Sequence, residues 1–458
     1  MIRDSILLGS AQAVNEAWSA RATWAPASLR VRGVVLIGPG EAPAPLIARA
    51  PVWDALDLSK VDAASLILID PPADGAAKRA VLARAAEAGL RCFLLTDGKL
   101  RRLRLEDLIG RPLGDVDFAR IREVVAGKRV LVTGGGGSIG GELARRIATL
   151  APARLTLLDS SEHNLYRIGL ELPDAVQVLT DIRDKQSVGR WFAKERPEIV
   201  FHAAALKQVP MVEAFPSEGV LTNVLGLQNV AEAARNVGAD LIFVSTDKAV
   251  DPSGLMGASK RLGEIYCQAL DRRGGERAIP VRLGNVLGSA GSVTPIFEEQ
   301  LAAGGPLTVT DPDVTRFFLT IPQAADALLQ AAAVGLNAEP RGCALVIEMG
   351  EALPVVELAR EVIRLAGLRP DGDVPIVYTG LRPGEKLHEV LVASDEWQAA
   401  DPAPGVIAVA SPARDLETVG AVMETLTSLA REGANDKIAA ALFAAIGFES
   451  LASRVRAG

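Results

Sequence analysis

The chain has 458 residues, 49% of them hydrophobic, which is more than one ordinary domain requires, so we expect two or three domains. Its formal net charge of −7 argues against nucleic acid as the main partner. Three scattered cysteines, three histidines, no long apolar run and no signal-peptide layout argue against a disulfide framework, a metal site and a membrane span, and favour a cytoplasmic setting.

The first 120 residues show only weak patterns of secondary structure. Residues 1–30 have no clean period and are interpreted as a partly helical lead segment. Residues 31–120 are predicted to form a small α/β domain, because apolar strand-like runs alternate there with a helical stretch over 77–89. The expected strands are 34–37, 66–69 and 92–95.

From residue 129 onward, strands and helices alternate at the spacing of an α/β fold. This order predicts a doubly wound parallel sheet of the Rossmann type, with the cofactor part over about 121–280 and a smaller substrate part mostly over 281–458. The expected strands are 130–132, 155–158, 176–179, 199–202, 241–245 and 279–282.

A glycine-rich turn follows the first of these strands. Residues 134–140 separate strand 130–132 from a helical pattern, and glycines there allow a tight turn and close approach to a pyrophosphate at the helix N-terminus. The next strand ends in Asp159, 19 residues after Gly140, where a carboxylate can accept hydrogen bonds from an adenosine ribose and repel a 2′-phosphate. The pattern therefore favours NAD over NADP and over the alternative of a ligand-free hinge.

The strand over 241–245 is followed directly by Thr246, Asp247 and Lys248. Ligands of open α/β sheets bind beyond the carboxyl ends of the strands, so these side chains are expected at the site. Met256 and Lys260 follow, four residues apart and therefore on one helix face. The alternative, a surface turn with solvated charges, is disfavoured by this placement.

Six stretches together carry a family resemblance over about residues 120–395. The chain resembles the extended short-chain dehydrogenases/reductases, and is most similar to the nucleotide-sugar 4,6-dehydratases of bacterial polysaccharide biosynthesis that act on UDP-N-acetylglucosamine. Residues 31–120 resemble the N-terminal nucleotide-fold-like domain of long members, whose membrane helices are absent from this sequence. The stretches are TGGGGSIG at 133–140, HAAALKQVP at 202–210, STDKAV at 245–250, MGASK at 256–260, RLGNVLGS at 282–289 and LRPGEK at 381–386.

The resemblance implies roles for the five catalytic candidates. Thr246 would bind the sugar C4 oxygen, Asp247 would protonate the C6 hydroxyl, Lys248 would remove the C5 proton and Lys260 would hold the nicotinamide ribose. Burial and the Lys260 cation would favour the neutral amine that Lys248 needs. Met256 stands where most of the superfamily has tyrosine, and a thioether cannot accept a proton usefully, so Asp247 would take the C4 hydroxyl proton. Whether Asp247 is the acid, the C4 base or both is left open.

The same resemblance implies residues for the two ligands, since a substrate diphosphate needs cationic partners. Glu213 is a weaker candidate for a sugar contact. The cofactor candidates are Gly134, Gly137, Ser138, Ile139, Gly140, Asp159, Asp181, Ile182, Ala203, Ala204 and Lys260, and the substrate candidates are Lys207, Arg282, Asn285, Arg316, Arg382 and Glu385.

These observations lead to one expected function and two alternatives. The expected function is a UDP-N-acetylglucosamine 4,6-dehydratase that uses NAD, loses water and yields UDP-2-acetamido-2,6-dideoxy-α-D-xylo-hexos-4-ulose with retained C5 configuration, in a homo-oligomer. The alternatives are a UDP-sugar 4- or 5-epimerase, which keeps the substrate mass, and an NAD-binding regulatory or scaffolding protein without turnover.

Overall fold

The computed structural model describes residues 4–37, 52–53, 63–71, 75–109 and 116–447. The chain forms two compact units, which are described separately. One comprises Met1–Arg111, Val293–Asp313 and Leu353–Gly380, and the other comprises Pro112–Ser292, Val314–Ala352 and Leu381–Gly458.

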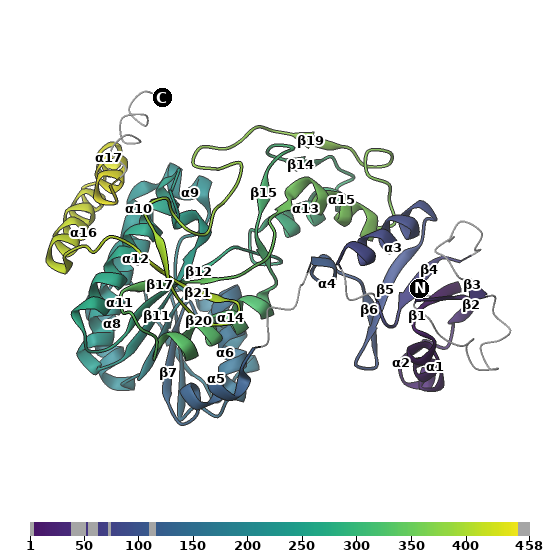
Figure 1. Cartoon of the computed structure of the whole chain (residues 1–458), viewed down its shortest axis with the longest axis horizontal. Helices are drawn as coiled ribbons and strands as arrows, with labels where there is room; N and C mark the ends of the chain where they lie inside the picture. Colours follow the sequence, from purple (N-terminus) through teal and green to yellow (C-terminus); the bar gives the residue numbers. More distant parts are fainter. Residues whose placement is uncertain (1–3, 38–51, 54–62, 72–74, 110–115, 448–458) are drawn as a thin grey trace. The chain divides into compact units, whose positions relative to one another are not determined.

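The second, larger unit is built on a nine-stranded sheet with the order β20-β21-β17-β12-β11-β10-β7-β8-β9 (Figure 1). The strands from β9 to β17 are parallel, and the strand order reverses between β7 and its neighbour β10, whereas β21 and β20 are antiparallel additions at one edge. This arrangement confirms the predicted doubly wound Rossmann fold. The strands are β7 (Arg129–Thr133), β8 (Arg154–Asp159), β9 (Val176–Leu179), β10 (Ile199–His202), β11 (Asp240–Thr246), β12 (Ala278–Leu283), β17 (Cys343–Ile347), β20 (Trp397–Ala403) and β21 (Val406–Ala410).

Helices cover both faces of this sheet, which explains why its central strands are apolar throughout. In β7, Val130 and Val132 face one core with α6 and α14, while Leu131 faces the other core with α8, α11 and α12. The helices are α5 (Phe118–Val125), α6 (Ser138–Thr149), α7 (Glu162–Glu171), α8 (Lys185–Glu195), α9 (Val209–Ala214), α10 (Pro216–Val220), α11 (Gly226–Val237), α12 (Leu255–Arg273) and α14 (Ile321–Gly335).

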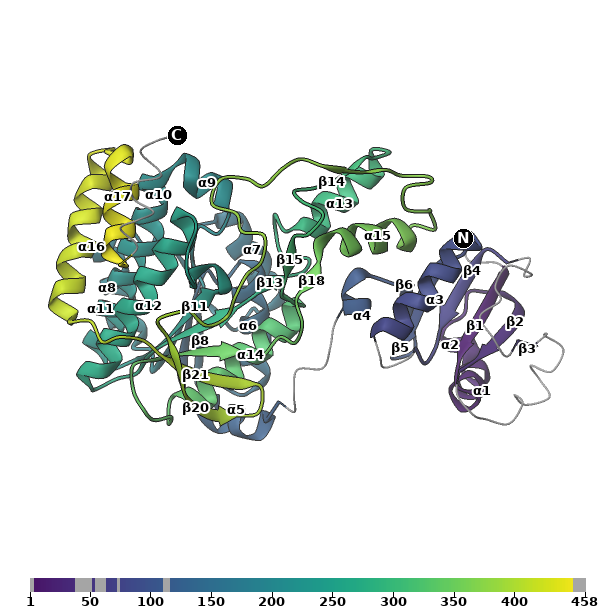
Figure 2. The same ribbon diagram turned by 45° about the horizontal axis from the view of Figure 1, so that its top comes forward.

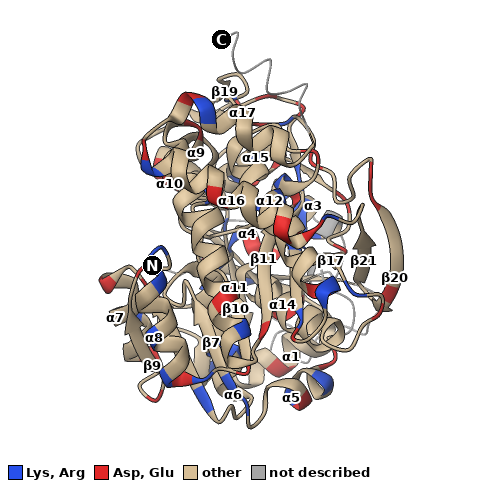
Figure 3. Cartoon of the chain, turned by 90° about the vertical axis from the view of Figure 1, so that its left-hand side faces the viewer, with Lys and Arg blue, Asp and Glu red and all other residues tan. Residues whose placement is uncertain are grey.

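Two C-terminal helices, α16 (Leu416–Arg431) and α17 (Asn435–Ala445), lie against α10 and α12 in both views (Figures 1 and 2). They bury Met423, Leu426, Ile438 and Leu442 in the α12 core. On the helices seen in Figure 3, acidic and basic residues are interspersed rather than gathered in one continuous stripe. None of the described helices combines the length and apolar character needed to cross a bilayer.

The first unit contains a six-stranded sheet with the order β3-β2-β1-β4-β5-β6, parallel except for β6. The same unit includes α13 (Val293–Ala302), α15 (Val355–Leu365) and the pair β14 (Leu307–Val309) and β19 (Ile376–Tyr378), with α15 packed on α3 and α4. The N-terminal elements are β1 (Asp4–Gly9), α1 (Ala11–Ser19), α2 (Arg21–Trp24), β2 (Arg30–Leu36), β3 (Val52–Trp53), β4 (Ser65–Leu68), α3 (Gly75–Glu87), β5 (Arg91–Thr96), β6 (Lys99–Arg102) and α4 (Leu105–Ile109).

Residues 1–30 are partly helical, as predicted, but they do not form a separate lead segment, because β1 belongs to the N-terminal sheet. β1 pairs with both β2 and β4, and its Ile6, Leu7 and Leu8 are fully buried. Three apolar residues give too short a run to reveal a strand until its neighbours cover both faces. The predicted boundaries at residues 120 and 280 stay predictions.

Candidate functional site

The glycine turn between β7 and α6 has the geometry of a phosphate cradle. Gly134 has φ +65°, and a Cβ there would lie 2.8 Å from the Ala204 nitrogen; a Cβ on Gly140 would lie 2.1 Å from the Gly134 oxygen. Both positions therefore require glycine. Helix α6 begins at Ser138 behind the N-cap Gly137, and no side chain caps it. Backbone packed this closely, at a helix N-terminus without a side-chain cap, fits a dinucleotide pyrophosphate.

The side chain of Asp159 lies at the carboxyl end of β8, beside this turn. Its carboxylate accepts hydrogen bonds from the backbone nitrogens of Gly136 at 3.0 Å and Ser161 at 2.9 Å. These contacts fix the carboxylate next to the turn, where the sequence predicts the adenosine ribose. The role of Asp159 in binding ribose stays a prediction.

The next two predicted cofactor segments follow β9 and β10. Burial alone would raise the pKa of Asp181, but hydrogen bonds from Arg183 lower it below its usual range. The buried Ile182 packs under Gly226. After β10, the Ala203 nitrogen donates to the Thr133 carbonyl at 3.2 Å and the Ala204 nitrogen donates to the Thr133 hydroxyl at 3.4 Å. Both alanines thus line the glycine turn, and their role in binding the cofactor stays a prediction.

Thr246, Asp247 and Lys248 form a compact polar cluster at the carboxyl end of β11. The oxygen Oδ1 of Asp247 accepts hydrogen bonds from the Thr246 hydroxyl and from Lys248 Nζ, both at 2.9 Å. Lys248 Nζ also donates to Asn285 Oδ1 at 2.7 Å. Asp247 is fully buried, and its Oδ2 has no hydrogen-bond partner among the described residues. The cluster therefore places a carboxyl group with one unpartnered oxygen in contact with an amine.

Met256 and Lys260 are both buried on α12. Lys260 Nζ donates to the Val244 carbonyl at 2.9 Å and lies 4.6 Å from the centre of the Phe243 ring. Burial lowers the pKa of Lys260 to about 8. The charged groups that contact Lys248 are instead carboxylates, Asp247 at 2.9 Å and Glu389 at 3.9 Å. Among the described residues, the Lys260 cation expected beside Lys248 is therefore not one of the charged groups in contact with it.

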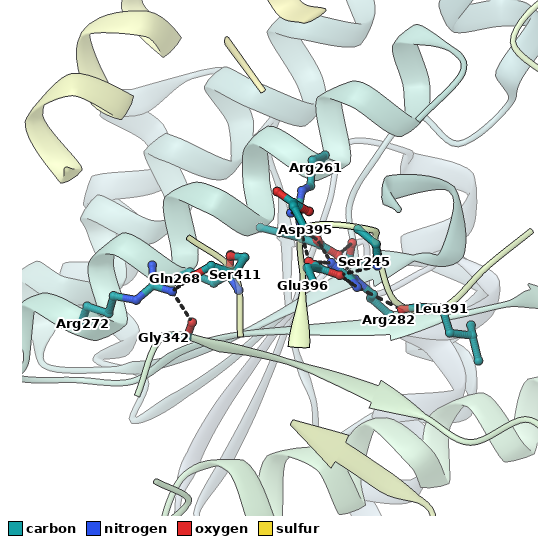
Figure 4. Close-up of polar contacts among 12 residues, drawn as sticks. Ser245, Arg261, Gln268, Arg272, Arg282, Gly342, Leu391, Asp395, Glu396 and Ser411 are labelled. Carbon is teal, nitrogen blue, oxygen red and sulfur yellow. Dashed lines mark hydrogen bonds and ion pairs between the residues drawn. The ribbon is translucent and has the colours of Figure 1, made fainter. Parts of the chain in front are cut away.

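Arg282 does not face the site, and the structure contradicts its predicted role in binding diphosphate. Its guanidinium is fully buried and pairs with Glu264 and Glu396, each at 2.6 Å. Figure 4 shows Arg282 beside Glu396. Arg261 contacts the same two carboxylates, and the Ser245 hydroxyl donates to Glu264 at 2.7 Å. The network joins α12, β12, the end of strand β11 and the loop 381–396.

The Glu396 carboxylate should make the stability of this network depend on pH. Burial alone would raise the pKa of Glu396, but hydrogen bonds and charge from Arg282, with help from Arg261, lower it to about 2 from an ordinary 4.5. A folded-state pKa below the unfolded value stabilises the fold above pH 4.5, and this contribution is lost as pH falls toward 2. We expect the urea midpoint to fall across that window, and the Glu396→Gln variant to show a shallower acid dependence; an identical dependence would contradict this assignment.

The remaining substrate candidates differ in their contacts. Lys207 is exposed and donates to the Ser289 hydroxyl at 3.1 Å, Asn285 contacts Lys248, and Arg382 is exposed. The Nη atoms of buried Arg316 donate to Glu385 and to the carbonyls of residues 315, 386 and 387. The structure therefore gives Arg316 an anchoring role for this loop in place of a phosphate contact. The roles of Lys207, Asn285, Arg382 and Glu385 stay predictions.

Sequence reasoning missed Glu389 and did not foresee the contact that Glu213 makes. Glu389 is buried between Lys248 and Lys386 although it lies 141 positions after Lys248, and no spacing rule links the two. Glu213, considered for a sugar contact, accepts a 2.6 Å hydrogen bond from the Leu255 nitrogen and so caps α12. Burial raises the pKa of Glu213.

The family model and the first curated relatives are all described as polysaccharide biosynthesis proteins. Residues 130–411 match the family described as polysaccharide biosynthesis protein. The capsular polysaccharide biosynthesis protein CapD of Staphylococcus aureus is 40% identical over 306 residues, which are 65% of this chain and 50% of that protein. The chain thus spans about half the length of the curated relatives it matches first.

Two further similarities point to different reactions. A UDP-glucose 4-epimerase of Rickettsia felis is 35% identical over 299 residues, covering 63% of this chain and 84% of that protein. The solved structure of DesIV from Streptomyces venezuelae, a dTDP-glucose 4,6-dehydratase with NAD bound, is 25% identical with a TM-score of 0.50, covering 57% of this chain and 87% of that chain.

Proposed function

The chain belongs to the polysaccharide biosynthesis protein family, and on that premise we propose that it is a UDP-N-acetylglucosamine 4,6-dehydratase that uses NAD. The product would be UDP-2-acetamido-2,6-dideoxy-α-D-xylo-hexos-4-ulose, with the C5 configuration retained. The observation that carries the proposal is the contact between Asp247 and Lys248 at the carboxyl end of β11, with Asp247 Oδ2 unpartnered among the described residues. Water elimination needs an acid and a base side by side, and this pair provides both.

The cradle around Gly134 and Gly140, with the α6 N-terminus, would hold the NAD pyrophosphate, and Asp159 would bind the adenosine ribose. Asp181, Ile182, Ala203 and Ala204 would line the adenine and ribose side. Lys260 would reach the nicotinamide ribose by exchanging its bond to the Val244 carbonyl. Bound NAD would supply a hydride acceptor for C4 and, once water has left, a hydride donor for C6.

The residues of the cluster divide the proton transfers between them. Thr246 would bind the C4 oxygen, and Asp247 would take the C4 hydroxyl proton because the thioether of Met256 cannot. Lys248 then removes the C5 proton while Asp247 returns a proton to the C6 hydroxyl. The C5–H and C6–O bonds break, the C5=C6 bond forms and water leaves. Lys248 finally returns its proton to C5, so that the protein ends each cycle in its starting protonation state.

A UDP-sugar 4-epimerase is the second candidate, supported by the similarity to the rickettsial enzyme. A 4-epimerase needs a base at C4 but has no step that uses an acid and a base at C5 and C6. The Asp247–Lys248 contact therefore favours the dehydratase. Met256 does not separate the two reactions, because both begin with removal of the C4 hydroxyl proton.

Incubation of the NAD-loaded protein with UDP-N-acetylglucosamine and a panel of other UDP-sugars tests the proposal. We expect a product lighter by one water, and in heavy water one deuteron at C5 by NMR. A product of unchanged mass would support the epimerase. Bound NAD without turnover of any sugar in the panel would support a regulatory or scaffolding protein.

A further inference from the structure

A cavity lined mainly by cations opens at the amino ends of β7 and β8, whereas the candidate site lies at the carboxyl ends of the parallel strands. Its volume is about 400 Å³, and it lies between the first residues of these two strands and the C-terminal end of α8. Pockets of this size accommodate small metabolites. The lining residues are Arg129, Arg154, Lys194, Glu195 and Arg196.

Four of these five side chains are cationic and exposed, although the whole chain has a net charge of −7. Arg129 pairs with Glu198 at 3.3 Å. Lys194 Nζ lies 4.5 Å from the centre of the Trp191 ring, and among the described residues no carboxylate pairs with Lys194 or Arg196. Because a concave surface with an excess of positive charge concentrates anions, the cavity favours an anionic ligand.

A buried carboxylate at the base of the cavity fixes one of the arginines. The Glu195 side chain is 2% exposed, and its Oε2 accepts a hydrogen bond from Arg154 Nε at 2.6 Å. The Nη atoms of Arg154 have no partner among the described residues, and neither has the buried Glu195 Oε1. A buried acceptor without a donor costs free energy, which a ligand carrying a hydroxyl group would recover.

The C-terminal end of α8 meets the cavity, and its partial negative charge would by itself repel an anion. Here the Arg196 carbonyl accepts a hydrogen bond from Arg129 Nε, which offsets that charge. Arg196 has φ +45° at the C-cap, a left-handed conformation in which glycine is usual after a helix. The arginine thus places a cation beside the cavity at a cost in backbone energy.

We propose that this cavity binds a phosphorylated small molecule with free ring hydroxyl groups, which is the chemistry shared by nucleotides and sugar phosphates. Arg154, Lys194 and Arg196 would bind the phosphate, since guanidinium groups match pairs of phosphate oxygens. Glu195 Oε1 would accept a hydrogen bond from a ring hydroxyl. The inference does not rest on the proposed function, because no residue of the candidate site lines the cavity.

Trp191 fluorescence can report binding, because Lys194 lies over the indole ring. AMP and glucose 1-phosphate are titrated separately into the whole NAD-loaded chain at constant ionic strength, with adenosine, glucose and sulfate as controls. We expect a saturable change with at least one of the two phosphate esters and none with the controls. The change should be absent from Trp191→Phe, and the ester that binds more tightly identifies the source of the ligand.

Arg154→Gln and Arg196→Gln should each weaken binding by about tenfold or more, the usual contribution of a charge-assisted hydrogen bond. Arg196→Gln changes an exposed side chain, so it still tests binding if the loss of the Glu195 partner unfolds Arg154→Gln. Lys185→Gln is the matched control, because it removes a cation of the same helix that pairs with Glu232. Its affinity should equal that of the wild type.

Three results would overturn the inference. The first is no saturable change with either ester, and the second is an equal change with sulfate, which would indicate general ionic screening. The third is an unchanged affinity in Arg196→Gln or a signal that persists in Trp191→Phe, since either would place the binding elsewhere on the chain.

Discussion

Lys248→Ala is expected to slow the loss of water from UDP-N-acetylglucosamine by about 10² to 10⁴-fold, the usual contribution of a positioned general base. Lys248 Nζ contacts Asp247 and Asn285, whereas the glycine cradle lies after β7. NAD binding should therefore be retained. The measurement combines product formation by mass spectrometry with the amount of NAD that co-purifies with the protein.

Two comparisons separate the loss of a base from a general defect. Lys185→Ala removes an exposed lysine that pairs with Glu232 on the surface, and its rate should equal that of the wild type. Small primary amines added to Lys248→Ala should restore part of the rate, increasingly with amine basicity. Near wild-type turnover in Lys248→Ala, or loss of NAD from that variant, would contradict the assignment of Lys248 as the C5 base.

Arg282→Met should be the most destabilising of the substitutions considered, by about 3–5 kcal/mol, the usual cost of removing one partner from a buried ion pair. The side chains of Arg282, Glu264 and Glu396 are each 0% exposed. Without Arg282, Arg261 alone would face two buried carboxylates. Urea unfolding monitored by circular dichroism measures the effect.

Arg145→Met is the matched comparison, since Arg145 pairs with Glu171 on the surface, where such pairs contribute about 0–1 kcal/mol. A small stability change in Arg282→Met together with a raised KM for the UDP-sugar would restore the discarded role of Arg282 in binding phosphate. A large stability loss with unchanged KM in the folded fraction would support its role in the network.

Several features followed from the sequence because they are encoded locally. The glycine turn, Asp159 at the end of β8 and the Thr246-Asp247-Lys248 run at the end of β11 each depend on a strand and the residues directly after it. Parallel strands bring their carboxyl ends to one edge of a sheet, so this order alone was enough to place the candidates together. The periodicity of the strands and helices likewise predicted the doubly wound fold.

Other features depended on contacts between distant segments, and tertiary structure alone decided them. Arg282 pairs with Glu396, 114 residues away, and this converts a predicted phosphate ligand into a buried anchor. Lys248 contacts Glu389 rather than a lysine, and β1 becomes a strand through its pairing with β2 and β4.

One physical reason separates the two groups of features. Backbone geometry and hydrophobic period are set by near neighbours in the chain, so a sequence displays them directly. The partner of a charged side chain depends on which segments come within a few ångströms of it when the chain packs and excludes water. No fixed sequence separation between the two residues reveals that partner.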